Sequence, residues 1–177
     1  MGYLKAFSLP VQGLKPGIHQ YEYALDQQFF EHFEASPVGE SALTVQMELD
    51  MRSNMMILDF TLEGWIKATC DRCGADIQLP LTNDQTLFVK YSEEKEEEED
   101  DVVFISRDAP ELNVARFVYE FVVLSLPITN TYDCENDTPR PCNMDVLDYL
   151  KRSEEDSNGD KDSGSSVWDA LKGLKED

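Results

Sequence analysis

Two consecutive stretches of alternating residues, 43–51 and 56–70, constrain the fold of this chain more than any other feature. In each stretch almost every second residue is apolar, which is the period of a β-strand that buries one face. Residues 52–54, Arg-Ser-Asn, lie between them and are typical of a turn. We therefore predict a long antiparallel hairpin, with Gly64 as a β-bulge in its second strand.

Shorter segments with a similar signal predict further strands in the same sheet. They comprise residues 18–25, 77–81, 87–91 and 102–105. The last two are separated by residues 93–101, which hold eight acids and one Lys. Like charges at that density repel one another and cannot be buried, so we expect a solvated acidic loop at 93–101.

Two helices are predicted to pack on this sheet. Asp26 is placed to cap a short helix that brings Phe29, Phe30 and Phe33 to one side. Residues 113–126 are apolar on nearly every side, which favours a helix at the centre of the core. The expected fold class is therefore α+β, an antiparallel sheet with a long hairpin packed on an apolar helix.

The length and composition fit one domain followed by a tail. A chain of 177 residues with 41% apolar residues can bury one ordinary core. We assign residues 1–152 to a single α+β domain, residues 153–166 to a flexible acidic linker, and residues 167–177 to a C-terminal amphipathic segment. We expect neither a secretory leader nor a membrane span, and so a cytoplasmic location.

The C-terminal segment carries Trp168, Leu171 and Leu174 at helical spacing after a Ser cap. A Trp at the end of a polar tether gains free energy from burial. Two arrangements stay open: the segment docks on its own domain or is disordered, or these three residues bind a partner.

Four cysteines form two close pairs, Cys70 with Cys73 and Cys134 with Cys142. Cys-x-x-Cys-Gly at a hairpin tip suits a metal knuckle, because two intervening residues let both sulfurs face one ion and Gly74 lets the backbone turn back. The four thiolates would supply a tetrahedral zinc site that joins the hairpin tip to a loop about sixty residues later.

Three alternatives to this structural zinc stay open: ordinary reduced thiols, disulfides, or a redox pair of Cys70 and Cys73. A reducing compartment weighs against disulfides. A thioredoxin-like pair belongs at the start of a helix after a strand, and this pair lies in a hairpin. Four thiolates would also close the coordination sphere, so the zinc is predicted to be structural. A thiol-based redox or metal-buffering protein is the alternative function.

Charge restricts the class of partner. The chain has 15 Lys and Arg against 36 Asp and Glu, which gives a formal net charge of −21. No stretch supplies the cluster of cations needed to grip phosphates, so we expect direct RNA binding to be weak or indirect. An acidic surface attracts a basic protein instead. Solubility and repulsion between copies are the simpler explanation of the same charge.

The sequence contains no recognisable catalytic motif. His19 and His32 are its only histidines, and they fall on a predicted strand and a short helix. There is no Gly-rich phosphate loop, no nucleophile elbow and no His-Glu-x-x-His. Carboxylate pairs arise by chance in a chain this acidic. We therefore predict no enzymatic activity and no small-molecule substrate.

The order of these motifs resembles the YceD family, described as large ribosomal RNA subunit accumulation proteins. The likeness rests on Cys70-x-x-Cys73 after the long hairpin, and on residues 120–127, which are similar to the family's Glu-x-x-x-Leu-x-x-Pro. It continues with the cysteines that follow and with the ending Trp168-x-x-Leu171-x-x-Leu174.

The resemblance implies a non-enzymatic factor in the processing or accumulation of large-subunit ribosomal RNA. Together with the charge, it predicts that the partner is a basic ribosomal protein or a large-subunit assembly factor.

Overall fold

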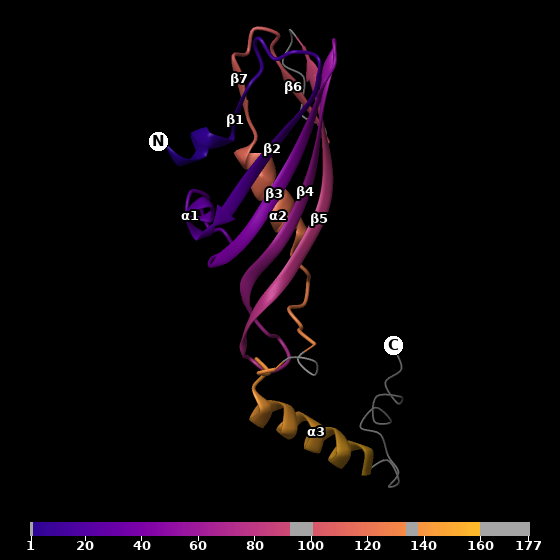
Figure 1. The fold of residues 1–177 in the computed structure, drawn as a ribbon. Helices are drawn as coiled ribbons and strands as arrows, with labels where there is room; N and C mark the ends of the chain where they lie inside the picture. The colour runs from indigo at the N-terminus through magenta and orange to yellow at the C-terminus, as the bar shows by residue number, and fades with distance from the viewer. Residues whose placement is uncertain (1, 93–100, 134–137, 160–177) are drawn as a thin grey trace, which may run out of the picture.

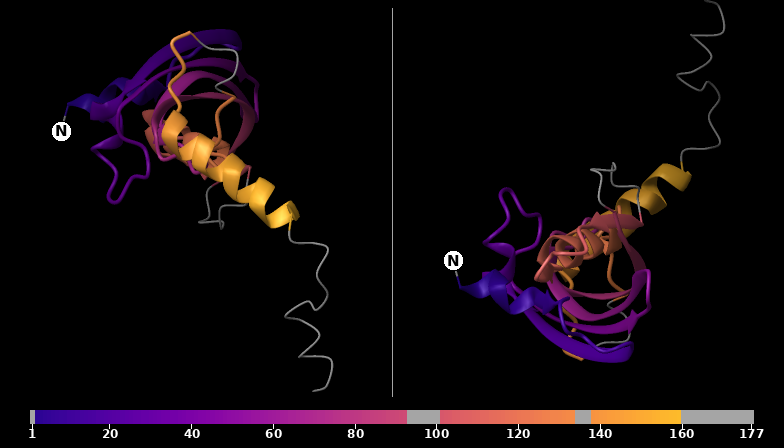
Figure 2. Two further views of the ribbon diagram at one scale, coloured as in Figure 1. Left: turned by 90° about the horizontal axis from the view of Figure 1, so that it is seen from below. Right: turned by 90° about the horizontal axis from the view of Figure 1, so that it is seen from above.

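A strongly curved five-stranded sheet forms the body of the molecule (Figures 1 and 2). The computed structural model describes residues 2–92, 101–133 and 138–159. Of residues 154–159 it describes the backbone alone. The strand order is β2-β3-β4-β5-β6. The strands are β2 (Gly17–Asp26), β3 (Ser41–Met51), β4 (Met55–Thr69), β5 (Asp76–Tyr91) and β6 (Val102–Ile105). The α+β class is confirmed.

The predicted hairpin is the centre of this sheet. β3 and β4 pair without interruption from Ser41 opposite Ile66 to Met51 opposite Met56. The turn at residues 52–54 is confirmed and is closed by the Arg52 N–H, which donates to the Met55 carbonyl at 3.0 Å. The alternation in the sequence corresponds to the two faces of the sheet. In β3 and β4 the apolar residues point to the buried face, and the residues between them are mostly exposed on the other face.

The predicted bulge at Gly64 is wrong, since this residue pairs in register with Leu43. Its backbone has φ of +144°, and a Cβ built there would collide with the Ala42 carbonyl oxygen. Glycine is needed because the neighbouring strand comes too close for any side chain and because L-residues rarely adopt this φ.

β5 is a single strand that contains both segments of alternating residues, 77–81 and 87–91. It pairs with β4 along its whole length, from Asp76 opposite Thr69 to Lys90 opposite Met55. Pro80 fits within it because β6 pairs only with its end, so β5 is still an edge strand at this point.

β6 corrects the prediction of a fully antiparallel sheet, because it runs parallel to β5, with Val102 opposite Phe88. The segment between these strands spans residues 92–101, which is long enough to bring the chain back to the level of Phe88. A short turn would have forced an antiparallel pair. Residues 93–100 of the predicted acidic loop lie outside the described residues.

Helix α2 (Ala115–Ser125) lies on the concave side of the sheet, and the strands curve around it (Figure 2). Its inner face buries Ala115, Val118 and Val122, and the Phe121 ring packs against Phe60 with centroids 5.2 Å apart. The predicted core helix is therefore present, but it is buried on one face only, because Leu124 on the outer face is 73% exposed. The sheet covers one side of the helix only.

The N-terminal part of the chain packs against the end of β2 that precedes the short helix α1 (Gln27–Phe30). The Asp26 cap is confirmed, since its Oδ1 accepts hydrogen bonds from the N–H groups of Gln28 and Phe29 at 3.0 and 3.3 Å. The remaining elements here are the 3-10 helix η1 (Tyr3–Phe7) and the strands β1 (Ser8–Pro10) and β7 (Glu111–Asn113), which pair with each other. Phe7 joins them to the core.

Helix α3 (Met144–Gly159) projects away from the sheet (Figure 1). It includes the first residues of the predicted linker 153–166, so residues 153–159 are helical. The rest of that linker and the predicted segment 167–177 lie outside the described residues. None of the helices in the described part of the chain has both the length and the apolar character that a membrane crossing requires.

Candidate functional site at the cysteine end of the sheet

The loop between β4 and β5, residues 70–75, is the cysteine loop that the sequence predicts at a hairpin tip. The Cys70 N–H donates to the Ala75 carbonyl, and the Gly74 N–H donates to the Cys70 carbonyl, both at 2.8 Å. Gly74 has φ of +69°, a left-handed conformation that glycine adopts without strain. The tight turn therefore follows from this glycine, as predicted.

The cysteine loop is fastened to the segment that follows α2 by a reciprocal pair of hydrogen bonds. The Asp71 N–H donates to the Asn130 carbonyl at 2.8 Å, and the Asn130 N–H donates to Asp71 Oδ2 at 2.7 Å. We call this pair the Asp71–Asn130 latch. The latch joins the cysteine loop to a segment about sixty residues later without a metal ion, whereas the cysteine pattern predicts zinc as the link between these regions. Apart from an Asp at a turn, nothing in the sequence indicates this latch.

The two cysteines of the loop are free and buried, with Cys70 2% and Cys73 3% exposed. Burial alone raises the pKa of the Cys70 thiol. The N–H groups of Cys73 and Arg72, the Cys73 thiol and the Tyr132 N–H donate to its sulfur and lower its pKa below the usual value. Sulfur that accepts several N–H donors is prepared to be a thiolate, the form that binds metal.

Of the second predicted pair of ligands, only Cys142 belongs to the described residues. Cys142 is buried and disulfide-bonded, and Cys134 lies outside the described residues. Within residues 2–92, 101–133 and 138–159, no three side chains of His, Cys, Asp or Glu gather as metal ligands. Two of the four predicted ligands therefore lie together. The complete set would require Cys142 as a thiolate, and so a reduced protein.

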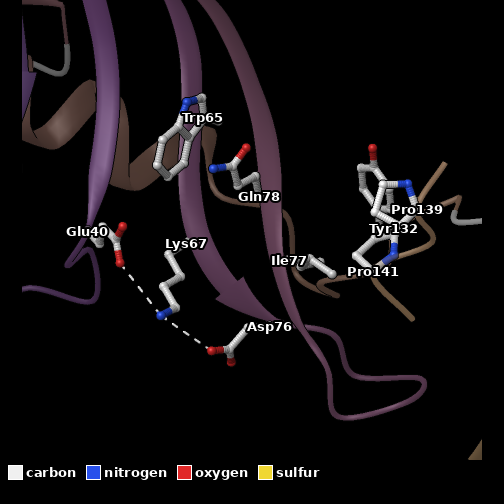
Figure 3. A pocket seen from close by; sticks show the side chains of 9 residues that line it. All are labelled: Glu40, Trp65, Lys67, Asp76, Ile77, Gln78, Tyr132, Pro139 and Pro141. Carbon is white, nitrogen blue, oxygen red and sulfur yellow. Dashed lines mark ion pairs between the residues drawn. The ribbon is translucent and has the colours of Figure 1, made fainter. Parts of the chain in front are cut away.

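A pocket of about 370 Å³ lies beside the cysteine loop, on the outer side of β4 and β5 (Figure 3). Lys67 in this pocket is held between Glu40, at 3.6 Å, and Asp76, at 3.3 Å. The hydrogen bond that the Lys67 ammonium group donates to the Asp76 carboxylate is the largest of the influences that raise the pKa of Lys67. Because two carboxylates neutralise its charge, this lysine is a poor anion ligand.

Sequence reasoning missed this pocket, although one signal was present. Trp65 has the outward parity of β4, where the other residues are mostly polar or charged. Tyr132, Pro139 and Pro141 form the opposite wall (Figure 3), and nothing in their order places them next to β5.

Both histidines bond to nearby backbone. A ring nitrogen of His19 lies 2.8 Å from the Lys15 carbonyl, and one of His32 lies 2.7 Å from the Gln28 carbonyl. The His32 ring also stacks on Tyr3 with centroids 5.2 Å apart. Packing is the role that these contacts support.

The fold and this site define a class: an α+β protein whose curved, largely antiparallel sheet ends in a Cys-x-x-Cys loop tied to the segment after its main helix. A family model described as "Large ribosomal RNA subunit accumulation protein YceD" matches residues 58–175, more than half of the chain. The chain belongs to the YceD family, as the sequence motifs indicated. The match begins within β4, so β2 and β3 lie outside it. Neither the curated proteins nor the solved structures gave a match.

Proposed function

We propose that this protein is a non-enzymatic ribosome biogenesis factor of the cytoplasm. It supports the accumulation of large-subunit ribosomal RNA by binding a basic ribosomal protein or a large-subunit assembly factor. The family links the chain to large-subunit ribosomal RNA. The observation that carries the choice of partner is the net charge of −21, which repels a polyanion and attracts a polycation.

The outer face of the sheet supports this choice. Its exposed side chains from β2 to β5 include several carboxylates, namely Glu22, Glu48, Asp59, Glu63 and Asp84. On the same face Lys67 is paired with Glu40 and Asp76. Such a face accelerates association with a cationic protein at low salt.

The proposal is tested by capture from a lysate at low salt, followed by identification of both the bound proteins and the bound RNA, with and without ribonuclease. A basic protein that is retained after ribonuclease treatment is the expected result. Tight, steeply salt-dependent binding of the purified protein to large-subunit RNA would overturn the proposal. The slope of the logarithm of the binding constant against the logarithm of the salt concentration counts the phosphates that the protein itself neutralises.

We further propose a structural zinc ion held by Cys70, Cys73, Cys134 and Cys142. The N–H donors around Cys70 fit a thiolate ligand, and both loop cysteines are free. When bound, the ion would cross-link the cysteine loop to the later segment without supplying catalysis.

Reduced protein should carry one zinc per chain, and chelation should release the metal and lower the melting temperature together. Release without loss of stability would instead favour the thiol-based redox or metal-buffering protein.

A further inference from the structure

The free edge of β2 faces the N-terminal segment across a groove of about 570 Å³, which we call the N-terminal groove. In Figures 1 and 2 this segment runs beside β2. The Phe7 ring stacks on Tyr23 with centroids 4.7 Å apart, so the segment is packed in place by the core. Tyr3 and Tyr21 add aromatic surface to the lining.

The edge itself has the geometry that an added strand requires. β2 is the terminal strand and pairs with β3 along all ten of its residues. No other strand in the described ranges pairs with it, so its outer row of N–H and C=O groups is a template for another chain. β5 has an open stretch as well, but Pro80 interrupts its donors there.

A second depression of about 530 Å³, the outer hollow, lies across β2, β3 and β4 on the other face of the sheet. Carboxylates of Glu22, Glu48 and Asp59 line it. Glu48 stands directly opposite Asp59 in the strand register, a like-charge pair that costs stability. Neutral side chains donate hydrogen bonds to this pair: Gln20 to Glu48 at 3.3 Å and Thr86 to Asp59 at 2.6 Å.

The N-terminal groove and the outer hollow share Tyr21 and Glu22, at the middle of β2. Side chains of a strand alternate between the two faces of a sheet. A strand added at this edge would therefore direct one set of side chains over the aromatic groove and the other set toward the carboxylates.

We propose that the edge of β2 binds an extended, cationic segment of a partner protein as a sixth strand, with Lys or Arg alternating with apolar residues. This inference rests on the proposed function, because it gives the basic partner a docking place and a conformation. Charge complementarity selects this occupant. A second copy of the chain would bring its own Glu22 and Asp26 and a net charge of −21 to the same edge.

The test uses the full chain and a synthetic peptide of about nine residues in which Lys and Val alternate. One control peptide has the same composition in two blocks, and another has Glu in place of Lys. Fluorescence anisotropy at about 0.15 M salt should show binding of the alternating cationic peptide only. Hydrogen exchange should show new protection confined to the amides of residues 17–26.

Two matched variants locate the site. Glu22→Lys and Glu63→Lys change the net charge equally, and both residues are exposed on the outer face, but only Glu22 is on β2. Glu22→Lys should weaken peptide binding about tenfold, and Glu63→Lys less than about twofold. Equal loss in both, or protection of amides away from β2, would overturn the edge site.

Two other outcomes separate this inference from the proposed function. If Glu22→Lys still captures the basic partner as well as the wild type does, the edge site is overturned while the proposed function stands. If no basic protein and no cationic peptide binds, both the edge site and the proposed function are overturned. A dimer in light scattering whose β2 amides are protected without peptide would overturn the proposal in favour of a second copy.

Discussion

Two regions of this sheet, the cysteine end and the edge along β2, differ in how their backbone hydrogen-bonding groups are used. At the cysteine end, the backbone groups of the loop are used within the chain: Cys70 bonds to Ala75, and the Asp71–Asn130 latch bonds the loop to a distant segment. Along β2, by contrast, the outer backbone groups pair with no strand in the described part of the chain. We therefore expect the closed end to contribute to stability, whereas the binding that we propose takes place at the open edge.

This difference teaches that stability and binding can be altered separately in this fold. Substitutions at the closed end should change unfolding without directly touching the proposed binding edge. Substitutions at the exposed positions of β2 should do the reverse, since surface changes usually alter stability little.

The largest expected effect is at Gly64, in the hairpin that both regions share. Gly64→Ala should lower the free energy of unfolding by about 3 kcal/mol or more, because a side chain there meets the backbone of Ala42 and the φ of +144° is strained. Urea unfolding measures this. Gly39→Ala is the matched control, with open space around the added methyl group, and should change stability by less than about 0.5 kcal/mol. Equal losses in both would contradict the close approach.

The latch should give the next largest effect. Asp71→Ala leaves the Asn130 N–H without its acceptor and should cost about 1–2 kcal/mol, whereas Asp71→Asn keeps an oxygen acceptor and should cost less. Hydrogen exchange should show faster opening of residues 128–133 in the alanine variant. Unchanged exchange there would mean that the latch does not hold the two segments together.

The pH dependence of stability probes the same end through Cys70. Its folded pKa is lowered, so the stabilisation is fully present above the pKa of the unfolded thiol and is lost as pH falls through the folded pKa. The unfolding free energy of the reduced, chelated protein should therefore rise with pH up to about pH 9. Cys70→Ser should flatten this rise, because a hydroxyl does not titrate in that range. An identical slope in the variant would assign the rise to other groups.

A smaller effect on stability, and of opposite sign, is expected in the outer hollow. Asp59→Asn removes a like charge opposite Glu48 and should raise the unfolding free energy by about 0.2–1 kcal/mol. The same change should weaken binding of the alternating Lys peptide. A variant that gains stability and binds as before would separate the outer hollow from the binding site.

The smallest effect on stability is expected at the C-terminal segment. Trp168→Ala combined with Leu171→Ala should leave the melting temperature within about 1 °C of the wild type, and association with the captured partner should weaken if Trp168, Leu171 and Leu174 bind it. A lower melting temperature would show instead that the segment docks on its own domain.

Local patterns sufficed for those parts of the fold that neighbouring residues determine. Alternation predicted β3 and β4 with their turn, and Asp26 predicted the start of α1, because period and capping are properties of short segments. They did not give the exposure of Leu124 or the direction of β6, because each depends on what another part of the chain covers or reaches.

In the candidate site, too, the features set by neighbouring residues could be predicted, and those that depend on distant residues could not. Cys70, Cys73 and Gly74 were placed correctly at a hairpin tip, since the spacing itself dictates that turn. Asn130 and the Trp65 pocket were not predicted, because their partners are distant in sequence. The open edge of β2 could not be predicted either, since alternation shows that a segment is a strand and not whether a neighbour follows it.

Pro80 has a consequence for how many chains the molecule can accept. A sheet with two equally receptive flanks can extend on both sides and so seed a growing stack of molecules. Here Pro80 interrupts the donors along the open stretch of β5, whereas β2 has no proline among its ten residues. Under the proposed edge binding, we therefore expect a titration with the alternating Lys peptide to saturate at one peptide per protein chain.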